Sequence, residues 1–189
     1  MKQKHQTDTD QRTVYIEHII ELFRLHGYDG LSLAKIGETL GMQKPSLYYH
    51  FPGGKLQMAE EALLHAAQKF ESAILVPLSD QNLPYQKRVK IMISEFDRFM
   101  NGGEPCVFLA LGGHEKLGPY IKDHMTNWVI HFAKFFESNG LKSSAAQEKA
   151  ESIIILLLGS VMMAHSMNDN VFYKRSLKEL EEKMKREAA

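Results

Sequence analysis

The sequence predicts an all-α protein, and three observations support this. Apolar residues recur at intervals of three and four through most of the 189-residue chain, and no stretch alternates as a credible strand would. The helical pattern stops at turn-forming residues, among them Gly27, Gly41, Gly53 and Gly54. An apolar content of 44% is enough for one large or two small cores. We expect about nine helices in two parts, residues 1–54 and residues 55–189.

Charge and cysteine content exclude several classes of protein. Lys plus Arg equals Asp plus Glu at 23 each, so overall charge does not indicate a polyanionic partner. The only cysteine, Cys106, excludes an internal disulfide and is expected to be a buried thiol in a reducing cytosol. The first residues lack the apolar core of a secretion signal, and we expect no membrane-spanning stretch. These features predict a cytoplasmic protein that does not bind membranes.

The first two helices are predicted from their ends. Helix 1 is expected from about Gln11 to His26, where Gly27 ends it. A second, short helix follows, with Ser32 as its N-cap and Gly41 as its left-handed end. Its apolar face is formed by Leu33, Ile36, Gly37 and Leu40. The pattern predicts a compact pair of helices packed against each other.

A third helix of about two turns is predicted after the turn at Gly41. Pro45 suits the first turn of this helix, while Pro52 and the glycines after it end it. A helix this short does not form alone in water, so Leu47 and Phe51 must hold it on a scaffold. Its other face carries Lys44, Ser46, Tyr48, Tyr49 and His50. Two short helices with a tight turn and such a face form a helix-turn-helix reader of the DNA major groove.

The segments HGYDGLSLAKIGETLGM and PSLYYHF, the latter followed by Gly-Gly-Lys, resemble the signature of the TetR (AcrR) family of bacterial repressors. The resemblance covers about Ile16 to Leu64. It implies a homodimer that binds a pseudo-palindromic double-stranded operator and is released by a small-molecule effector, with no cofactor. The residues that it assigns to DNA binding are Ser32, Gln43, Lys44, Pro45, Ser46, Tyr48, Tyr49, His50 and Lys55. Among them, Pro45 and Tyr48 are implied to approach base edges, and Ser46, Tyr49, His50 and Lys55 to bind phosphates.

Three positions depart from the family pattern. Leu33 stands where relatives usually have a phosphate-binding Thr, for which Ser32 can substitute, and Gln43 replaces a usual Ser. Lys55 lies four residues after Phe51 rather than three, and the sequence FPGGK is similar to the subgroup of the lincomycin-resistance repressor. These departures leave an alternative open, a small-molecule-binding or interaction protein with a degenerate helix-turn-helix.

The rest of the chain predicts further helices. They are expected at Lys55–Val76, Tyr85–Met100, Leu117–Ser138, Ser144–Asn168 and Val171–Arg186, with a short apolar segment at Cys106–Leu111. The helix Ser144–Asn168 contains the run IIILLLGSVMMAH and is apolar on all sides, so it needs partners on every face. We expect the last two helices to form a four-helix interface with their twofold mates. The alternative is a central helix within a monomer.

Large adaptable side chains are concentrated in the middle helices, which enclose the ligand in TetR relatives. We expect a pocket for a mostly apolar or aromatic compound, because Met and aromatic side chains adapt to varied apolar ligands. The candidate lining residues are Phe96, Phe99, Met100, Phe108, Met125, Trp128, His131, Phe132, Met162 and Met163. His131 or Asn127 is expected to orient a polar group. The alternative for each of these residues is ordinary core packing.

Catalytic and metal-site interpretations find no support. His114, Glu115, His124 and His131 lie close in sequence, but their spacing does not fit one metal ion and HExxH is absent. No Gly-rich phosphate loop, serine elbow or paired-carboxylate motif is present. The sequence therefore predicts a regulator and not an enzyme.

Overall fold

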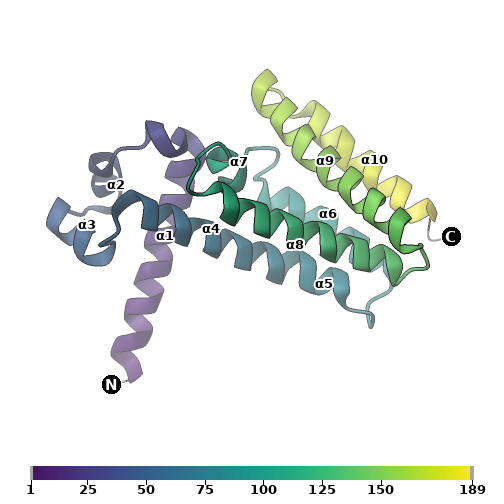
Figure 1. Ribbon diagram of the computed structural model, residues 1–189, viewed down its shortest axis with the longest axis horizontal. Helices are drawn as coiled ribbons and strands as arrows, with labels where there is room; N and C mark the ends of the chain where they lie inside the picture. Colours follow the sequence, from purple (N-terminus) through teal and green to yellow (C-terminus); the bar gives the residue numbers. More distant parts are fainter. Residues whose placement is uncertain (1, 188–189) are drawn as a thin grey trace. The chain divides into compact units, whose positions relative to one another are not determined.

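The computed structural model describes residues 2–187, and the side chains from residue 11 to residue 186; all regular structure in this range is helical (Figure 1). The helices are α1 (Lys2–Gly30), α2 (Leu33–Leu40), α3 (Lys44–His50), α4 (Gly54–Phe70), η1 (Glu71–Leu75), α5 (Val76–Ser79), α6 (Tyr85–Phe99), α7 (Val107–Leu111), α8 (Gly118–Glu137), α9 (Ser143–Met167) and α10 (Val171–Glu187). The predicted all-α class is confirmed.

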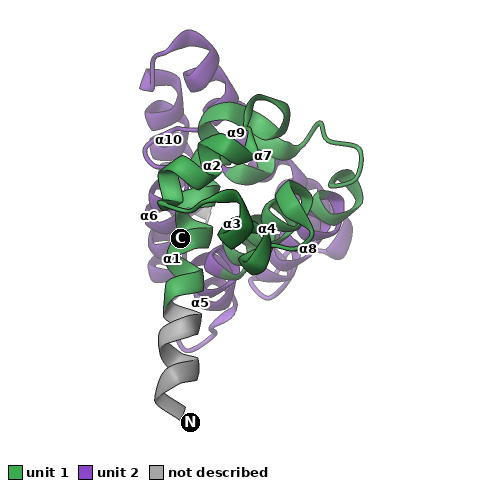
Figure 2. Ribbon diagram, turned by 90° about the vertical axis from the view of Figure 1, so that its left-hand side faces the viewer, with its two compact units in different colours: residues 1–68, 107–121 green, residues 69–106, 122–189 purple. Residues whose placement is uncertain are grey.

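Two compact units divide the chain (Figure 2). Unit 1 comprises residues 1–68 and 107–121, and unit 2 comprises residues 69–106 and 122–189. The expected boundary after residue 54 therefore does not coincide with that of the units. In unit 1, α7 packs on α1, which adds a segment from the middle of the chain to the N-terminal helices. Sequence order alone gives no signal for such an insertion.

The first helix begins before the expected Gln11 and is interrupted where the sequence predicts its end. Gly27 has φ 64° and ψ −174°, and the chain then makes a further helical turn to Gly30. A Cβ at Gly27 would lie 3.8 Å from the Ala110 carbonyl oxygen of α7. The break at Gly27 thus lies where α7 approaches α1.

The helix expected over Lys55–Val76 is a run of three segments without a break. The Val76 N–H bonds to the Glu71 carbonyl oxygen, five residues back, which is the π-helical pattern of η1. Pro77 then lies in the first turn of α5, where its missing N–H is tolerated, so the rod continues to Ser79. Counted as one rod, α4, η1 and α5 bring the described part of the chain to the nine helices predicted.

Aromatic packing dominates the core of unit 2. The rings of Phe70 and Trp128 stack at 3.9 Å between centroids, and Phe99 meets the Phe70 ring edge-on at 5.1 Å. A buried cation, Arg88, lies 5.0 Å over the Phe135 ring and donates to the Leu78 carbonyl and to Asn139 Oδ1. Cys106 is buried, as expected. The core of unit 2 is therefore largely apolar, and its buried guanidinium is held by neutral acceptors.

The helices α9 and α10 lie side by side within unit 2 (Figure 1). The two faces of α9 differ in exposure. Ile153, Leu157 and Val161 are buried, whereas Ile155 is 71% exposed. Other exposed apolar residues of α9 are Leu156, Met162, Met163 and Met167. Several large apolar side chains therefore remain exposed on α9.

Contrary to expectation, one described helix reaches the length and apolar composition of a membrane span. This is α9, of whose most apolar 18-residue window 33% is buried within the chain. The core helix of a soluble protein can have the same length and composition, so these two properties alone do not indicate a membrane protein.

Candidate nucleic-acid interface

The turn between α2 and α3 is built by specific backbone contacts. Ser32 caps α2, because its Oγ accepts from the Lys35 N–H at 3.1 Å, which confirms the predicted N-cap. Gly41 ends the helix with φ 64°, in the left-handed region. A Cβ at Gly37 would lie only 2.7 Å from the Met42 carbonyl oxygen, so glycine is required there. These contacts produce the tight turn that a helix-turn-helix needs.

The short helix α3 is anchored by two apolar side chains and exposes its other face. Leu47 and Phe51 are 1% and 0% exposed, as the sequence predicts. Tyr49 is 83% exposed and Tyr48 is 41% exposed. Gln43, Lys44, Pro45 and Ser46 are also exposed, and no acidic residue lies in α3. The structure thus brings most of the predicted DNA-contacting residues together on one open surface.

His50 differs from the rest of this surface because it is half-buried. Its ring contacts the Tyr15 ring edge-on at 5.5 Å and the Tyr49 ring at 5.3 Å. The structure therefore places His50 at the edge of the open face, against α1.

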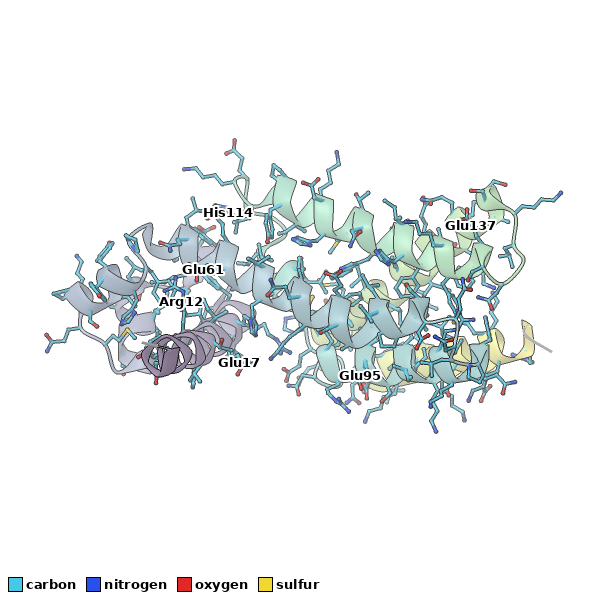
Figure 3. All side chains as sticks on the ribbon, turned by 90° about the horizontal axis from the view of Figure 1, so that it is seen from below. Arg12, Glu17, Glu61, Glu95, His114 and Glu137 are labelled. Atoms are coloured by element: carbon cyan, nitrogen blue, oxygen red, sulfur yellow. The ribbon has the colours of Figure 1, made fainter. Side chains whose placement is uncertain are left out.

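A residue that the sequence analysis did not single out, Arg12, holds the end of α3. Its Nη1 donates to the His50 carbonyl at 2.9 Å, and its guanidinium lies 4.7 Å over the Phe51 ring. Its Nε and Nη2 donate to the two carboxylate oxygens of Glu61 at 3.0 and 2.5 Å (Figure 3). A bidentate pair of this kind fixes geometry as well as adding energy. Arg12 thus ties α1, the end of α3 and α4 together.

The same network extends into the turn after α3. Gln57 donates to Glu61 Oε1 at 2.8 Å, and its own Oε1 accepts from the Gly53 N–H at 2.7 Å. Gln57 and Glu61 are four residues apart on α4, a spacing that a sequence can suggest. Their partner Arg12 is 49 residues from Glu61, and no local pattern signals such a pairing.

Lys55 has other partners than the predicted phosphate. Its Nζ donates to the carbonyl oxygens of Tyr28 at 2.7 Å and Leu31 at 2.9 Å, and it lies 4.3 Å from the centre of the Tyr28 ring. The ammonium group is therefore engaged within unit 1, whereas Lys44 is exposed at the start of α3.

Tyr28 is the centre of an aromatic group at the end of α1. Its ring stacks on Phe23 with centroids 6.1 Å apart, and it contacts the His114 ring at 3.8 Å. Burial, with smaller contributions from Asp29 and Glu60, raises the pKa of the Tyr28 hydroxyl, so this group stays neutral at physiological pH.

Among the described residues, His, Cys, Asp and Glu side chains do not gather in groups of three that could hold a metal.

The predicted effector-contacting residues divide into several environments. Phe108 belongs to unit 1, and the other nine belong to unit 2. In unit 2, Phe96, Met100, Trp128 and Phe132 are buried, whereas Phe99, Met125 and His131 are half-buried. Met162 and Met163 are 44% and 48% exposed, on the open face of α9. Phe70, which stacks on Trp128, was not among the residues expected to contact the effector.

Comparison with known proteins supports the helix-turn-helix assignment. Residues 16–62 match the family profile described as bacterial regulatory proteins, tetR family. The HTH-type transcriptional regulator LmrA of Bacillus subtilis (strain 168) is 48% identical over 162 residues, which cover 82% of this chain and 86% of that protein. The uncharacterized HTH-type transcriptional regulator YxaF of the same organism is 27% identical over 167 residues, 85% of this chain and 87% of its own.

Solved structures show the same fold. A TetR-family transcriptional regulator from Agrobacterium tumefaciens has a TM-score of 0.76 at 16% identity, covering 93% of this chain and 97% of that one. A cysteine mutant of the TetR-family regulator CifR, solved with 26-bp double-strand operator DNA, has a TM-score of 0.67 at 20% identity, covering 88% and 95%. With the match to LmrA over most of both chains, these findings show that the chain belongs to the TetR family, whose members are soluble DNA-binding transcriptional regulators and not enzymes.

Proposed function

We propose that this protein is a homodimeric repressor that binds a pseudo-palindromic operator through α3 and leaves it when a small molecule binds unit 2. The observation that carries the proposal is the face of α3, where Tyr48 and Tyr49 are exposed while Leu47 beneath them is buried. Exposed tyrosines suit a binding surface, because each combines an apolar ring with a hydroxyl that can form a hydrogen bond. Operator DNA is bound by the structural relative CifR, and LmrA is named a transcriptional regulator.

The residues on this surface divide by role. Pro45 and Tyr48 approach base edges and specify the site, whereas Ser46, Tyr49 and His50 bind phosphates and set the register. Gln43 and Lys44, at the start of α3, contact the DNA beside them. Ser32 keeps its hydroxyl proton available for a phosphate, because as an N-cap its oxygen only accepts a bond.

The exposed apolar face of α9 is the proposed dimer interface, together with α10. Obligate dimer interfaces resemble a core cut in half, and the exposed Ile155, Leu156, Met162 and Met163 fit that composition. Gly159 lies among them, and a Cβ there would meet nothing within 4 Å, so a partner helix has room to approach closely. Sedimentation at micromolar concentration should give twice the chain mass of 21.6 kDa. A monomer at that concentration would contradict the dimer.

The proposed effector is a mostly apolar, aromatic molecule held within unit 2. Phe99, Met125 and His131 are half-buried beside the buried Trp128, so they combine adaptable apolar surface with one polar group. His131 or Asn127 orients a polar group of the ligand. Because α4 begins in unit 1 and ends in unit 2, its movement on ligand binding would reach the α3 reader.

Reciprocal coupling tests the effector proposal. Operator DNA must weaken ligand binding by the same factor as ligand weakens DNA binding, about 5- to 150-fold. Calorimetry with a compound that releases the protein from DNA, with and without operator, measures this factor. Equal ligand affinity in both states would mean that the compound is bound but not sensed.

Titration of the purified protein against the DNA upstream of its own gene tests the whole proposal. We expect specific binding there, about 1,000-fold or more tighter than to competitor DNA at the same salt concentration. Ligand binding without any DNA preference would instead support a small-molecule-binding protein with a degenerate helix-turn-helix. Repression of this kind takes place in the cytoplasm, where the operator is accessible.

A further inference from the structure

We propose that Lys55 is a positioning residue that fixes the helix-turn-helix on α4, and that it does not contact a DNA phosphate. This inference rests on the proposed DNA-binding function and assigns Lys55 a different role in it. The observation behind it is the pair of hydrogen bonds from Lys55 Nζ to the carbonyls of Tyr28 and Leu31.

The two carbonyls that hold Lys55 lie beyond the regular part of α1. Tyr28 is in the short turn that follows the break of α1 at Gly27, and Leu31 follows that turn directly. Carbonyls beyond a helix end lack intrahelical partners, so they can accept hydrogen bonds from an ammonium group. The Tyr28 ring, 4.3 Å from Nζ, adds a cation–π contact to the same site. Two carbonyl oxygens and the face of one aromatic ring thus surround the Lys55 ammonium group.

The position of Lys55 at the start of α4 explains why its ammonium group needs these acceptors. Lys55 is the second residue of α4, near the positive end of that helix dipole, and the first turn of α4 contains no acidic residue. A cation at this place is unfavourable unless another group compensates for it. The end of α1 supplies that compensation, so the side chain is directed inward rather than left in solvent.

The contact closes a loop around the DNA-reading element. Leu31 immediately precedes Ser32, the N-cap of α2, and Lys55 follows the turn that ends α3. The whole helix-turn-helix lies between these two residues, and the Lys55 ammonium joins its two ends across 24 positions of sequence. Without the ammonium group, the residues that precede α2 would no longer be bonded to α4. The helices α2 and α3 could then change orientation together.

Hydrogen exchange of the DNA-free protein tests the clamp without any knowledge of the operator. In Lys55→Met, which keeps the apolar stem, we expect amides of α2 to exchange about tenfold faster than in the wild type. Amides of α9 should be unchanged, and circular dichroism should show the same helix content. Unchanged exchange in α2 would overturn the proposal.

Salt dependence of DNA binding separates a positioning role from a phosphate contact. Removing one phosphate-binding cation reduces the slope of log K against log salt by about 0.9. We expect Lys44→Met, the matched control, to show this reduction. Lys55→Met should weaken binding to the upstream DNA about tenfold while keeping the wild-type slope.

Two results would contradict the inference and leave the proposed function intact. The first is a slope reduced in Lys55→Met as much as in Lys44→Met, which would make Lys55 a phosphate ligand. The second is wild-type affinity of Lys55→Met for the upstream DNA, which would mean that Lys55 has no role in DNA binding. If the wild type itself does not bind the upstream DNA, the proposed function fails, and hydrogen exchange still decides whether the clamp exists.

Discussion

The helices α3 and α9 both expose side chains that we assign to binding a partner, but the exposed side chains of the two helices differ in chemical character. On α3 the open residues are Lys44, Pro45, Ser46 and two tyrosines, with no acidic group in the helix. On the second half of α9 they include large aliphatic and thioether side chains, with Ile155 71% exposed. Tyrosine and lysine suit a polar, charged partner, whereas the α9 face suits another apolar surface.

The way each helix is held differs as well. A network of charged and amide groups centred on Arg12 fixes the end of α3, and this suits a short helix that cannot form alone. The helix α9 has 25 residues and is held by buried apolar side chains. A helix that contacts DNA bases must keep a fixed orientation, whereas a helix in a dimer interface must bury a large apolar surface. The predictions below test this contrast in order of expected effect.

The largest effect is expected at the α9 face. Gly159→Leu adds a side chain into open space in the subunit, so the fold should persist while the partner helix is pushed away. Loss of the dimer separates the two half-site contacts, and operator affinity should fall about 100- to 10,000-fold. Sedimentation and operator titration check this. The control Lys87→Leu, on an exposed position of α6, should remain a dimer, and a dimeric Gly159→Leu would argue against this interface.

The next effect concerns base reading by α3. Tyr48→Ala should change the preferred sequence, with a loss of about 1 to 3 kcal/mol at the original operator, because a base contact is removed. Its neighbour Tyr49→Phe loses only a hydroxyl and should weaken all sites alike. Selection from a randomised operator pool measures both. Identical selected sequences for Tyr48→Ala and the wild type would remove Tyr48 from the specificity set.

A smaller effect is expected from the Arg12–Glu61 pair. The two side chains are 37% and 26% exposed, so solvent screening limits their coupling to about 1 kcal/mol. A double-mutant cycle with Arg12→Met and Glu61→Gln, read by thermal unfolding and operator affinity, measures this coupling. Lys35→Met with Glu38→Gln, an exposed pair on α2, is the matched control. Coupling no larger than in the control would leave Arg12 without its proposed role.

The smallest effect is a pH dependence in unit 2. Burial lowers the pKa of His124 below its usual 6.5, although Asp123 and Glu71 oppose this shift. The unfolded chain then binds more protons than the folded one at acidic pH, so the free energy of unfolding decreases as the pH falls below 6.5. His124→Gln should reduce this decrease, as measured by unfolding at about pH 7.5 and about pH 5.5, on either side of the usual histidine pKa. The exposed His26→Gln is the control, and equal acid sensitivity in both variants would contradict the assignment.

Local chemistry explains how much of the fold could be predicted. The ends of α2 and α3 follow from Ser32, Gly41 and Pro45, whose backbone preferences are set by neighbouring residues. The π-helical turn at Glu71–Leu75 was missed because the apolar periodicity continues through it. The partners of Arg12 and Lys55 were missed because hydrogen bonds between distant segments leave no spacing signal.

The burial of the expected effector-contacting residues was harder to predict than the exposure of the α3 face. Met162 and Met163 are apolar like Phe132, and sequence alone does not tell an interface from a core. Only the structure separates them, by exposure. The α3 face could be predicted because polar residues alternate with two buried anchors on a helix of known bounds.

Chemical protection of the upstream DNA by the wild-type protein tests the central claim most directly. A dimer that reads DNA through two copies of α3 should protect two symmetry-related major-groove segments about 34 Å apart, or a multiple of that spacing. The DNA between these segments should stay accessible in the groove that faces away from the protein. Protection of a single segment, or none at saturating protein in moderate salt, would contradict the account.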